Sequence, residues 1–199
     1  MKTLYTGISC PDPTFVHTPL IEIHPVAATD SLKQAASEVD TYDYLLFTSR
    51  YAVRYFPLQS KHPTIVSIGS TTSEALRQMG VNTISQVEQD DSYGVIDWFA
   101  RQPRGRVLIP RSNLALNIIP QGLTDLGFDV TTITAYENRM PEDVKKVDLD
   151  QIDTIVFTSP STIDNFIRLY GCLPTDKQLL TLGRITEKHL QTKIKQQSI

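Results

Sequence analysis

The chain alternates between short apolar runs and longer segments in which apolar residues recur at helical spacing. The runs LYT, YLLF, TIVSI, VLIP and TIVF are continuously apolar, which is typical of strands buried on both faces. Strands separated by helices favour parallel sheets with helix-covered faces, so the pattern predicts an α/β fold. We expect strands at residues 2–7, 19–25, 44–47, 64–68, 106–111, 128–137, 154–157 and 178–182.

Two motifs occur twice, in the same order. YLLFTSRYAVRYF at residues 44–56 and TIVFTSPSTIDNF at residues 154–166 both read as a strand, Phe-Thr-Ser and an amphipathic helix. IGSTTSEALRQMG at residues 68–80 and LGRITEKHLQTKI at residues 182–194 both read as a strand end, Gly-x-x-Thr and a helix. The chain thus contains an internal repeat of one structural unit, which predicts two α/β domains of similar design.

Further helices and two linkers complete the expected organisation. Helices are expected at residues 31–39, 93–100 and 113–127, and Pro120 should kink or split the last of these. HPVAATD (24–30) and YENRMPED (136–143) each carry proline and polar residues after an extended stretch, at the same point of the two repeats. We interpret these two segments as the crossings between the domains.

Small hydroxyl residues gather where the predicted strands end and helices begin. In an open parallel sheet this carboxyl edge is where ligands bind. Taken alone, each residue is more simply a helix N-cap, because Ser and Thr accept hydrogen bonds from free backbone N–H groups. Together, several helix N-termini facing one space would suit a ligand with several carboxylates or phosphates. The residues are Thr48, Ser49, Thr71, Thr72, Ser112, Ser159, Ser161 and Thr186.

Composition and charge exclude several classes of function. Lys and Arg number 19 against 22 Asp and Glu, and the net charge of −3 gives no nucleic-acid footprint. No apolar run reaches membrane-spanning length and the start, MKTLYTGISCPDP, lacks the apolar core of a signal peptide, so we expect a cytoplasmic protein. The cysteines form no CxxC, the histidines are scattered, and no dinucleotide or phosphate-loop motif occurs. The sequence therefore implies no metal and no dinucleotide.

Four segments, taken in order, carry a resemblance to a known family. They are FTSRYAVRYF, VSIGSTTSEALRQMGV, VLIPRSNLALNIIPQGLTDLGFDVTTITAYENRMP and VFTSPSTIDNF, and through them the chain resembles uroporphyrinogen-III synthase. The resemblance implies two flavodoxin-like or Rossmann-like domains with parallel sheets, joined by a two-stranded linker. Domain 1 would be discontinuous and trimmed, with residues 1–23 and 144–199. Domain 2 would be residues 31–128, and residues 24–30 and 129–143 would be the linkers.

The resemblance also implies an activity. The family cyclises hydroxymethylbilane, a linear tetrapyrrole with eight carboxylates, to uroporphyrinogen III, with inversion of ring D and release of water. This step belongs to heme, siroheme and cobalamin biosynthesis and uses no cofactor and no metal. For this chain we expect the tetrapyrrole as a small-molecule partner, no nucleic acid, no membrane, and a monomer.

Particular residues match the family's motifs. Tyr136 in TAYENR matches a tyrosine beside the second linker and is the candidate proton donor to the departing hydroxyl. A linker aromatic packed against a domain edge is an equally good interpretation of Tyr136. Arg111 is a candidate partner for a propionate, with a surface salt bridge as the plainer alternative. The candidate binding residues are Ser49, Thr71, Thr72, Arg111, Ser112, Ser159, Ser161 and Thr186, of which Thr72 and Thr186 match the threonines of the two Gly-x-x-Thr turns.

The chain also departs from the family pattern. Only GISCPDPTFVHT separates the first two strands, and its two prolines make the family's usual helix improbable there. Ile185 in GRIT stands where a hydroxyl residue is common. Two alternatives to the enzyme therefore stay open: a non-catalytic two-domain protein that binds a tetrapyrrole or another polycarboxylate, and, more remotely, a flavodoxin-like signalling domain.

Overall fold

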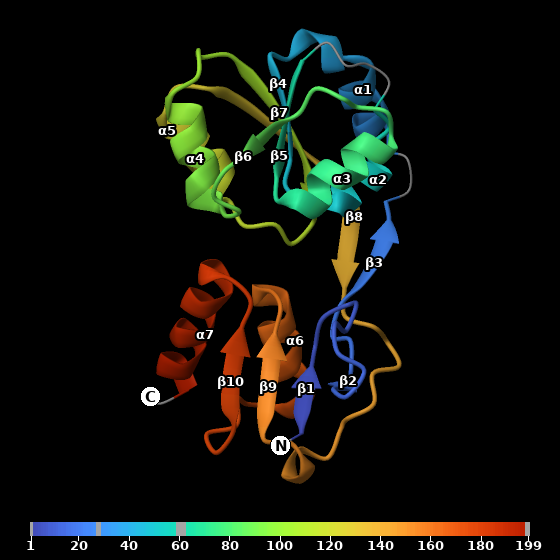
Figure 1. Cartoon of the computed structure of the whole chain (residues 1–199), viewed down its shortest axis with the longest axis vertical. Helices are drawn as coiled ribbons and strands as arrows, with labels where there is room; N and C mark the ends of the chain where they lie inside the picture. Colours follow the sequence, from blue (N-terminus) through green and yellow to red (C-terminus); the bar gives the residue numbers. More distant parts are fainter. Residues whose placement is uncertain (1, 27–28, 59–62, 198–199) are drawn as a thin grey trace. The chain divides into compact units, whose positions relative to one another are not determined.

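The chain folds into two compact units. A computed structural model describes residues 2–26, 29–58 and 63–197. Unit 1 combines Met1–Glu22 with Asn138–Ile199, and unit 2 is Ile23–Glu137. The chain crosses between the units within β3 (Glu22–Pro25) and within β8 (Asp129–Arg139) (Figure 1). Unit 1 is therefore discontinuous in sequence, whereas unit 2 is a single stretch.

Unit 2 is built on a six-stranded sheet in the order β3-β8-β7-β4-β5-β6. Neighbouring strands from β8 to β6 all pair in parallel, and Tyr44 of β4, for example, lies between Thr64 of β5 and Val107 of β7. The remaining strands are β4 (Tyr44–Phe47), β5 (Thr64–Ile68), β6 (Ser85–Val87) and β7 (Arg106–Ser112). The helices are α1 (Asp30–Ser37), η1 (Val39–Thr41), α2 (Arg50–Tyr55), α3 (Ser70–Gln78), α4 (Ser92–Ala100) and α5 (Ile118–Asp125).

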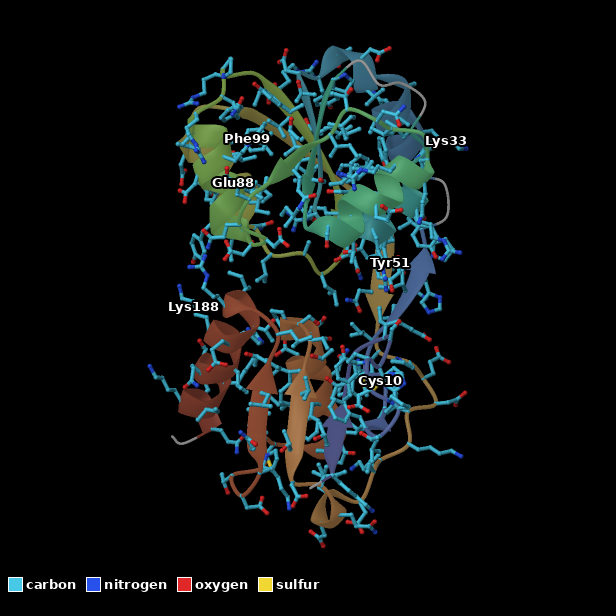
Figure 2. All side chains as sticks on the ribbon, viewed as in Figure 1. Cys10, Lys33, Tyr51, Glu88, Phe99 and Lys188 are labelled. Atoms are coloured by element: carbon cyan, nitrogen blue, oxygen red, sulfur yellow. The ribbon has the colours of Figure 1, made fainter. Side chains whose placement is uncertain are left out.

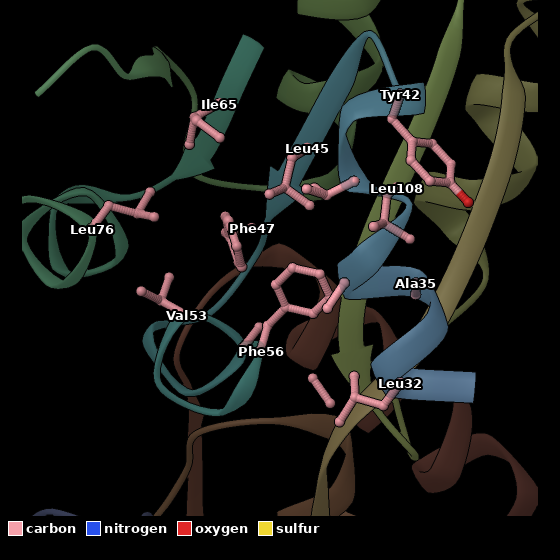
Figure 3. Close-up of a cluster of buried hydrophobic side chains, with 14 of the residues drawn as sticks. Leu32, Ala35, Tyr42, Leu45, Phe47, Val53, Phe56, Ile65, Leu76 and Leu108 are labelled. Atoms are coloured by element: carbon pink, nitrogen blue, oxygen red, sulfur yellow. The ribbon is translucent and has the colours of Figure 1, made fainter. Parts of the chain in front are cut away.

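Two hydrophobic cores lie on opposite faces of this sheet. Successive residues of a strand point to opposite faces, so Leu45 and Phe47 enter one core while Tyr44 and Leu46 enter the other. The first core is closed by α1, α2 and α3, and Figure 3 shows Leu45, Phe47 and their neighbours converging there. Phe99 of α4 belongs to the second core. Burial on both faces explains why YLLF is apolar throughout.

Unit 1 has a four-stranded sheet in the order β10-β9-β1-β2, with every pair parallel. Its core gathers Leu4 of β1, Ile155 and Phe157 of β9, Phe166 of α6 and Leu190 of α7. The elements are β1 (Thr3–Tyr5), β2 (Val16–His17), η2 (Leu149–Gln151), β9 (Thr154–Phe157), α6 (Pro160–Tyr170), β10 (Gln178–Thr181) and α7 (Arg184–Gln197). Residues 6–15 form turns without a helix, as their prolines predicted.

The α/β fold with parallel sheets is confirmed, and several element predictions need correction. The helix predicted at 113–127 is wrong in its first third, because α5 begins at Ile118. Pro120 neither kinks nor splits α5, since it lies in the first turn, where its missing N–H has no partner to lose. The predicted helix at 31–39 is α1, which ends at Ser37 and is followed by η1. Strands β2 and β6 were not predicted, and the strand predicted at 19–25 begins only at Glu22.

Candidate active site

The carboxyl edge of the unit 2 sheet brings three of the predicted residues together. Ser49 follows β4 and caps α2 by accepting a hydrogen bond from the Tyr51 N–H at 3.1 Å. Ser112 ends β7, and Tyr136 lies in the neighbouring strand β8. The phenol oxygen of Tyr136 is hydrogen-bonded to the hydroxyls of both Ser49 and Ser112. Three segments far apart in sequence therefore meet at one phenol.

A register shift aligns Ser112 with Tyr136. From Arg106 to Arg111 the β7–β8 ladder keeps one register, in which Arg111 lies opposite Thr134. The next pair is Ser112 and Tyr136, so β8 contains one extra residue at this point. In the unshifted register Ser112 would lie opposite Ala135. Such bulges re-aim side chains and recur beside active sites.

Burial sets the protonation state of Tyr136. Its side chain is 8% exposed and belongs to the core that α1, α2 and α3 cover. The rings of Tyr51 and Tyr55 lie 5.9 Å and 6.4 Å from the Tyr136 ring, centroid to centroid. Burial raises the pKa of the phenol, the Ser49 and Ser112 hydrogen bonds lower it in part, and the Tyr51 phenol raises it. Tyr136 is therefore a protonated acid across the neutral range, and its serine partners favour the phenolate that proton donation would leave.

The Arg111 side chain binds the loop that follows its own strand, β7. Its guanidinium donates hydrogen bonds to the Ala115 carbonyl and, at 3.1 Å, to Asn117 Oδ1. Burial lowers the pKa of this arginine. These bonds, with the 3.2 Å bond from the Ala115 N–H to the Ser112 carbonyl, fix the loop that follows β7. This geometry explains why residues 113–117 form no helix, and it gives Arg111 a structural task that the sequence did not indicate.

The loop at residues 113–117 presents exposed apolar side chains. Leu114 and Leu116 are 50% and 48% exposed. The loop begins where the Asn113 N–H donates to the Tyr136 carbonyl at 3.3 Å. Its backbone is therefore joined to the strand that carries the phenol.

Thr71 and Thr72 lie in the first turn of α3. Gly69, which precedes this helix, has a φ of +76°, a conformation that glycine adopts without strain. Thr71 is exposed, whereas Thr72 is buried at 2% exposure. Only Thr71 is thus open to a ligand in this conformation.

Unit 1 contains a second group of hydroxyls at the end of β9. Ser159 caps α6 in a capping box with Thr162, and its Oγ lies 2.9 Å from the Oγ of Ser161. The Asn138 side-chain amide donates to Ser161 Oγ at 3.4 Å. Thr186 lies in the first turn of α7, after Gly183 with φ of +89°, and is buried at 4% exposure. Of the three predicted site residues in this unit, Ser159 and Ser161 are therefore the accessible ones, since both side chains are partly exposed.

Sequence reasoning missed the aromatic neighbours of Tyr136. Tyr51 and Tyr55 are four residues apart, which places both rings on one face of α2. That spacing was readable, but nothing local indicated that the face would meet β8. Asn138, the amide partner of Ser161, was missed as well.

The described residues contain neither a cluster of metal ligands nor a membrane-spanning helix. Within residues 2–26, 29–58 and 63–197, the side chains of His, Cys, Asp and Glu form no group of three that could hold a metal ion. Over the same residues, every helix is too short or too polar to cross a bilayer.

Comparison with known proteins identifies relatives across nearly the whole chain. Residues 14–198 match the family described as Uroporphyrinogen-III synthase HemD. A relative from Methanothermobacter thermautotrophicus is 28% identical over 162 residues, a match that spans 73% of this chain and 64% of that protein. The uroporphyrinogen-III synthase of Chlorobaculum parvum is 28% identical over 194 residues, with 87% of this chain and 77% of the relative covered.

A solved structure shares the fold. A mutant uroporphyrinogen III synthase from Thermus thermophilus superimposes with a TM-score of 0.69 at 16% identity, covering 96% of this chain and 88% of that one. At this identity the likeness concerns the fold alone. The family match carries the classification because it spans far more than half of the sequence. The chain belongs to the uroporphyrinogen-III synthase family.

Proposed function

We propose that this protein is a uroporphyrinogen-III synthase. It would cyclise hydroxymethylbilane with inversion of ring D, release water, and act as a cyclising hydro-lyase in porphyrin biosynthesis. The observation that carries the proposal is the buried phenol of Tyr136 held by two serine hydroxyls, in a chain that matches the family over residues 14–198.

Tyr136 has the properties that the first step needs. Loss of the substrate hydroxyl as water requires a proton, and the phenol O–H supplies it as the carbon–oxygen bond breaks. Transfer is downhill because the departing hydroxide is a far stronger base than a phenolate. The azafulvene cation then faces a phenolate, to which Ser49 and Ser112 can donate hydrogen bonds. When the macrocycle has closed and a ring carbon loses its proton, the phenolate takes that proton back, and the cycle balances.

Ring inversion needs control of conformation more than reactive groups. The spiro intermediate must fragment and reclose while water and other nucleophiles are kept away from the cation. The exposed Leu114 and Leu116, on the loop whose Asn113 N–H donates to the Tyr136 carbonyl, suit the shielding role. The hydroxyls at Thr71 and at Ser159 and Ser161, with the backbone N–H groups of their helix starts, suit the substrate carboxylates.

We propose further that the two units are two domains of one monomeric enzyme. Domain 1 would correspond to the discontinuous unit 1 and domain 2 to unit 2, with β3 and β8 forming the two-stranded connection. Each unit ends its strands in hydroxyl-bearing helix starts of the same design, which supports a shared ligand.

The decisive experiment follows the isomers. Purified protein is mixed with freshly generated hydroxymethylbilane, and the oxidised products are separated into type I and type III. Type III product well above the spontaneous background is expected. Type I product alone overturns the synthase, and type I product with tight tetrapyrrole binding identifies the non-catalytic binder instead.

A further inference from the structure

Arg50 on α2 occupies a position that elementary electrostatics disfavours. It is the first residue of the helix, where the positive end of the helix dipole repels a cation. Arg54 lies in the last turn, where the dipole favours a cation, but it stands at i+4 from Arg50, so the two like charges repel each other. Both side chains are exposed. Such local violations concentrate at functional sites.

Neither arginine is compensated by an acid in the part of the chain that the structure describes. Arg50 Nη2 donates to the Tyr51 hydroxyl at 3.2 Å, and its guanidinium lies 5.1 Å from the centroid of that ring. The Arg54 guanidinium lies over Tyr55, 5.5 Å from the ring centroid. The nearby Arg77 of α3 differs, since it forms an ion pair with Glu74 at 3.8 Å. The two guanidiniums of α2 therefore keep donors for an anion from outside the chain.

Both arginines line a groove of about 590 Å³ along α2 and α3. This volume lies within the roughly 300–1,000 Å³ range of small-molecule sites. Met79, at 45% exposure, is one of its apolar residues. The full lining is Arg50, Tyr51, Val53, Arg54, Ala75, Gln78 and Met79, which combines two cations and an amide with an apolar floor.

The groove adjoins the Tyr136 site through one aromatic residue. Tyr51, labelled in Figure 2, lines the groove, and its ring lies 5.9 Å from that of Tyr136. A ligand with several acidic arms can therefore have its reacting carbon near Tyr136 and one arm in the groove.

We propose that this groove is a carboxylate subsite, in which Arg50 and Arg54 bind one acidic arm of a tetrapyrrole and the apolar floor contacts its hydrocarbon. The ligand class rests on the proposed function. A carboxylate between two guanidiniums forms charge-assisted hydrogen bonds and removes the repulsion that the empty helix carries. Removal of either charge should therefore weaken ligand binding, and removal of the Arg50 charge should leave the ligand-free fold equally or more stable.

The test uses uroporphyrin, the fully oxidised octacarboxylate, which binds without reacting. Its affinity is measured by fluorescence titration for the parent, Arg50→Gln, Arg54→Gln and the double variant. Glutamine keeps much of the side-chain stem while removing the charge. Arg77→Gln is the matched control, because it removes an exposed arginine of the neighbouring helix that already has a partner. Melting temperatures are recorded without ligand.

Each single variant should bind uroporphyrin roughly threefold to tenfold more weakly, and the double variant more weakly still. The melting temperature of Arg50→Gln should equal or exceed that of the parent, because this change removes a cation from the positive end of the helix dipole. Arg77→Gln should bind like the parent. Parent-like binding by the double variant overturns the subsite, as does equal weakening by Arg77→Gln, which would mean a general charge effect. A parent that does not bind uroporphyrin overturns it too. Arginine-dependent binding by a protein that makes no type III product overturns the synthase and leaves the subsite standing.

Discussion

Tyr136 lies opposite Ser112 across the β7–β8 ladder, one residue out of the register that the preceding pairs keep. The shift brings a serine hydroxyl to a buried phenol, and Ser49 reaches the same phenol from the start of α2. The proton donation and phenolate stabilisation proposed above would thus depend on backbone geometry, because the extra residue decides which residue Ser112 lies opposite.

Replacement of Tyr136 by phenylalanine tests its role as a proton donor. Tyr136→Phe should lower turnover about tenfold to a thousandfold, the range for lost general acid catalysis, with substrate binding little changed. Some activity should survive, since the substrate hydroxyl also leaves spontaneously. The measurement is the initial rate of type III product.

Tyr44→Phe is the matched control for this variant. Tyr44 is equally buried, and its hydroxyl donates to the Pro103 carbonyl at 3.0 Å, away from the candidate site. Its loss should reduce stability by about 1 kcal/mol and leave turnover unchanged. If Tyr136→Phe retains activity within about twofold of the parent, Tyr136 is a packing residue.

The protonation of Tyr136 should make the fold sensitive to alkali. Burial raises the pKa of this phenol above its ordinary value of 10.0, so the folded protein holds the proton to higher pH than the unfolded chain does. The corresponding stability is fully present below the unfolded value and is lost as the pH rises through the folded value. Denaturation between about pH 8 and pH 11 should show a shallower loss for Tyr136→Phe than for the parent.

Ser112→Ala supplies the internal check on that interpretation. The Ser112 hydrogen bond lowers the pKa of the phenol, so its removal should raise the pKa further. Spectroscopic titration of tyrosinate would show one group shifted upward relative to the parent. An unchanged titration would mean that Ser112 does not hold the phenol in solution.

Arg111 should act as the anchor of the loop at residues 113–117. Arg111→Ala removes the donors to Ala115 and Asn117 and should weaken the loop by roughly 1–2 kcal/mol, with faster amide hydrogen exchange confined to it. The type III fraction should fall with it if the loop shields the intermediate. Arg104→Ala is the control, because Arg104 bonds the carbonyls of Phe99 and Gln102 elsewhere. Equal exchange of the loop in both variants would show that Arg111 is no anchor.

Capping and ligand binding can be separated at Ser159. Ser159→Ala removes the N-cap of α6 and should cost about 1 kcal/mol of stability, whereas Ser159→Asp keeps an acceptor for the Thr162 N–H and should preserve stability. The added carboxylate should nevertheless repel an acidic ligand and weaken uroporphyrin binding severalfold or more. Denaturation and titration of the two variants provide the readouts. Parent-like binding by Ser159→Asp would restrict Ser159 to capping.

Features encoded within a few residues could be predicted from the sequence. The continuous apolar run of β4 and the Ser49 cap of α2 are both local, since burial on two faces requires the first and free N–H groups require the second. Strand β6, SQV, escaped prediction because it is a short edge strand with polar residues. The helical pattern at 113–127 fails in its first residues, where the Arg111 guanidinium binds the Ala115 carbonyl and holds the chain as a loop.

The residues of the candidate site could be predicted from the sequence, but the contacts between them could not. Tyr136, Ser49 and Ser112 were each singled out, yet nothing in their separate motifs indicated that their hydroxyls would meet. That meeting depends on the extra residue in β8, and no local rule marks Ala135 as the insertion. The Arg111 side chain was open to a ligand partner on sequence grounds, and its two loop acceptors became visible only with the fold.

The discontinuity of unit 1 dictates an order of events during synthesis. Strand β1 precedes unit 2 in the chain, yet its neighbour in the sheet on one side is β9, about 150 residues later, as Thr3 opposite Thr154 illustrates. Unit 2 is complete in one stretch by Glu137 and can close its cores while β1 still lacks that neighbour. Strand β1 is then made before unit 2 but gains its β9 neighbour only after unit 2, and a folded unit 2 shortens the span of chain that must be closed for this pairing.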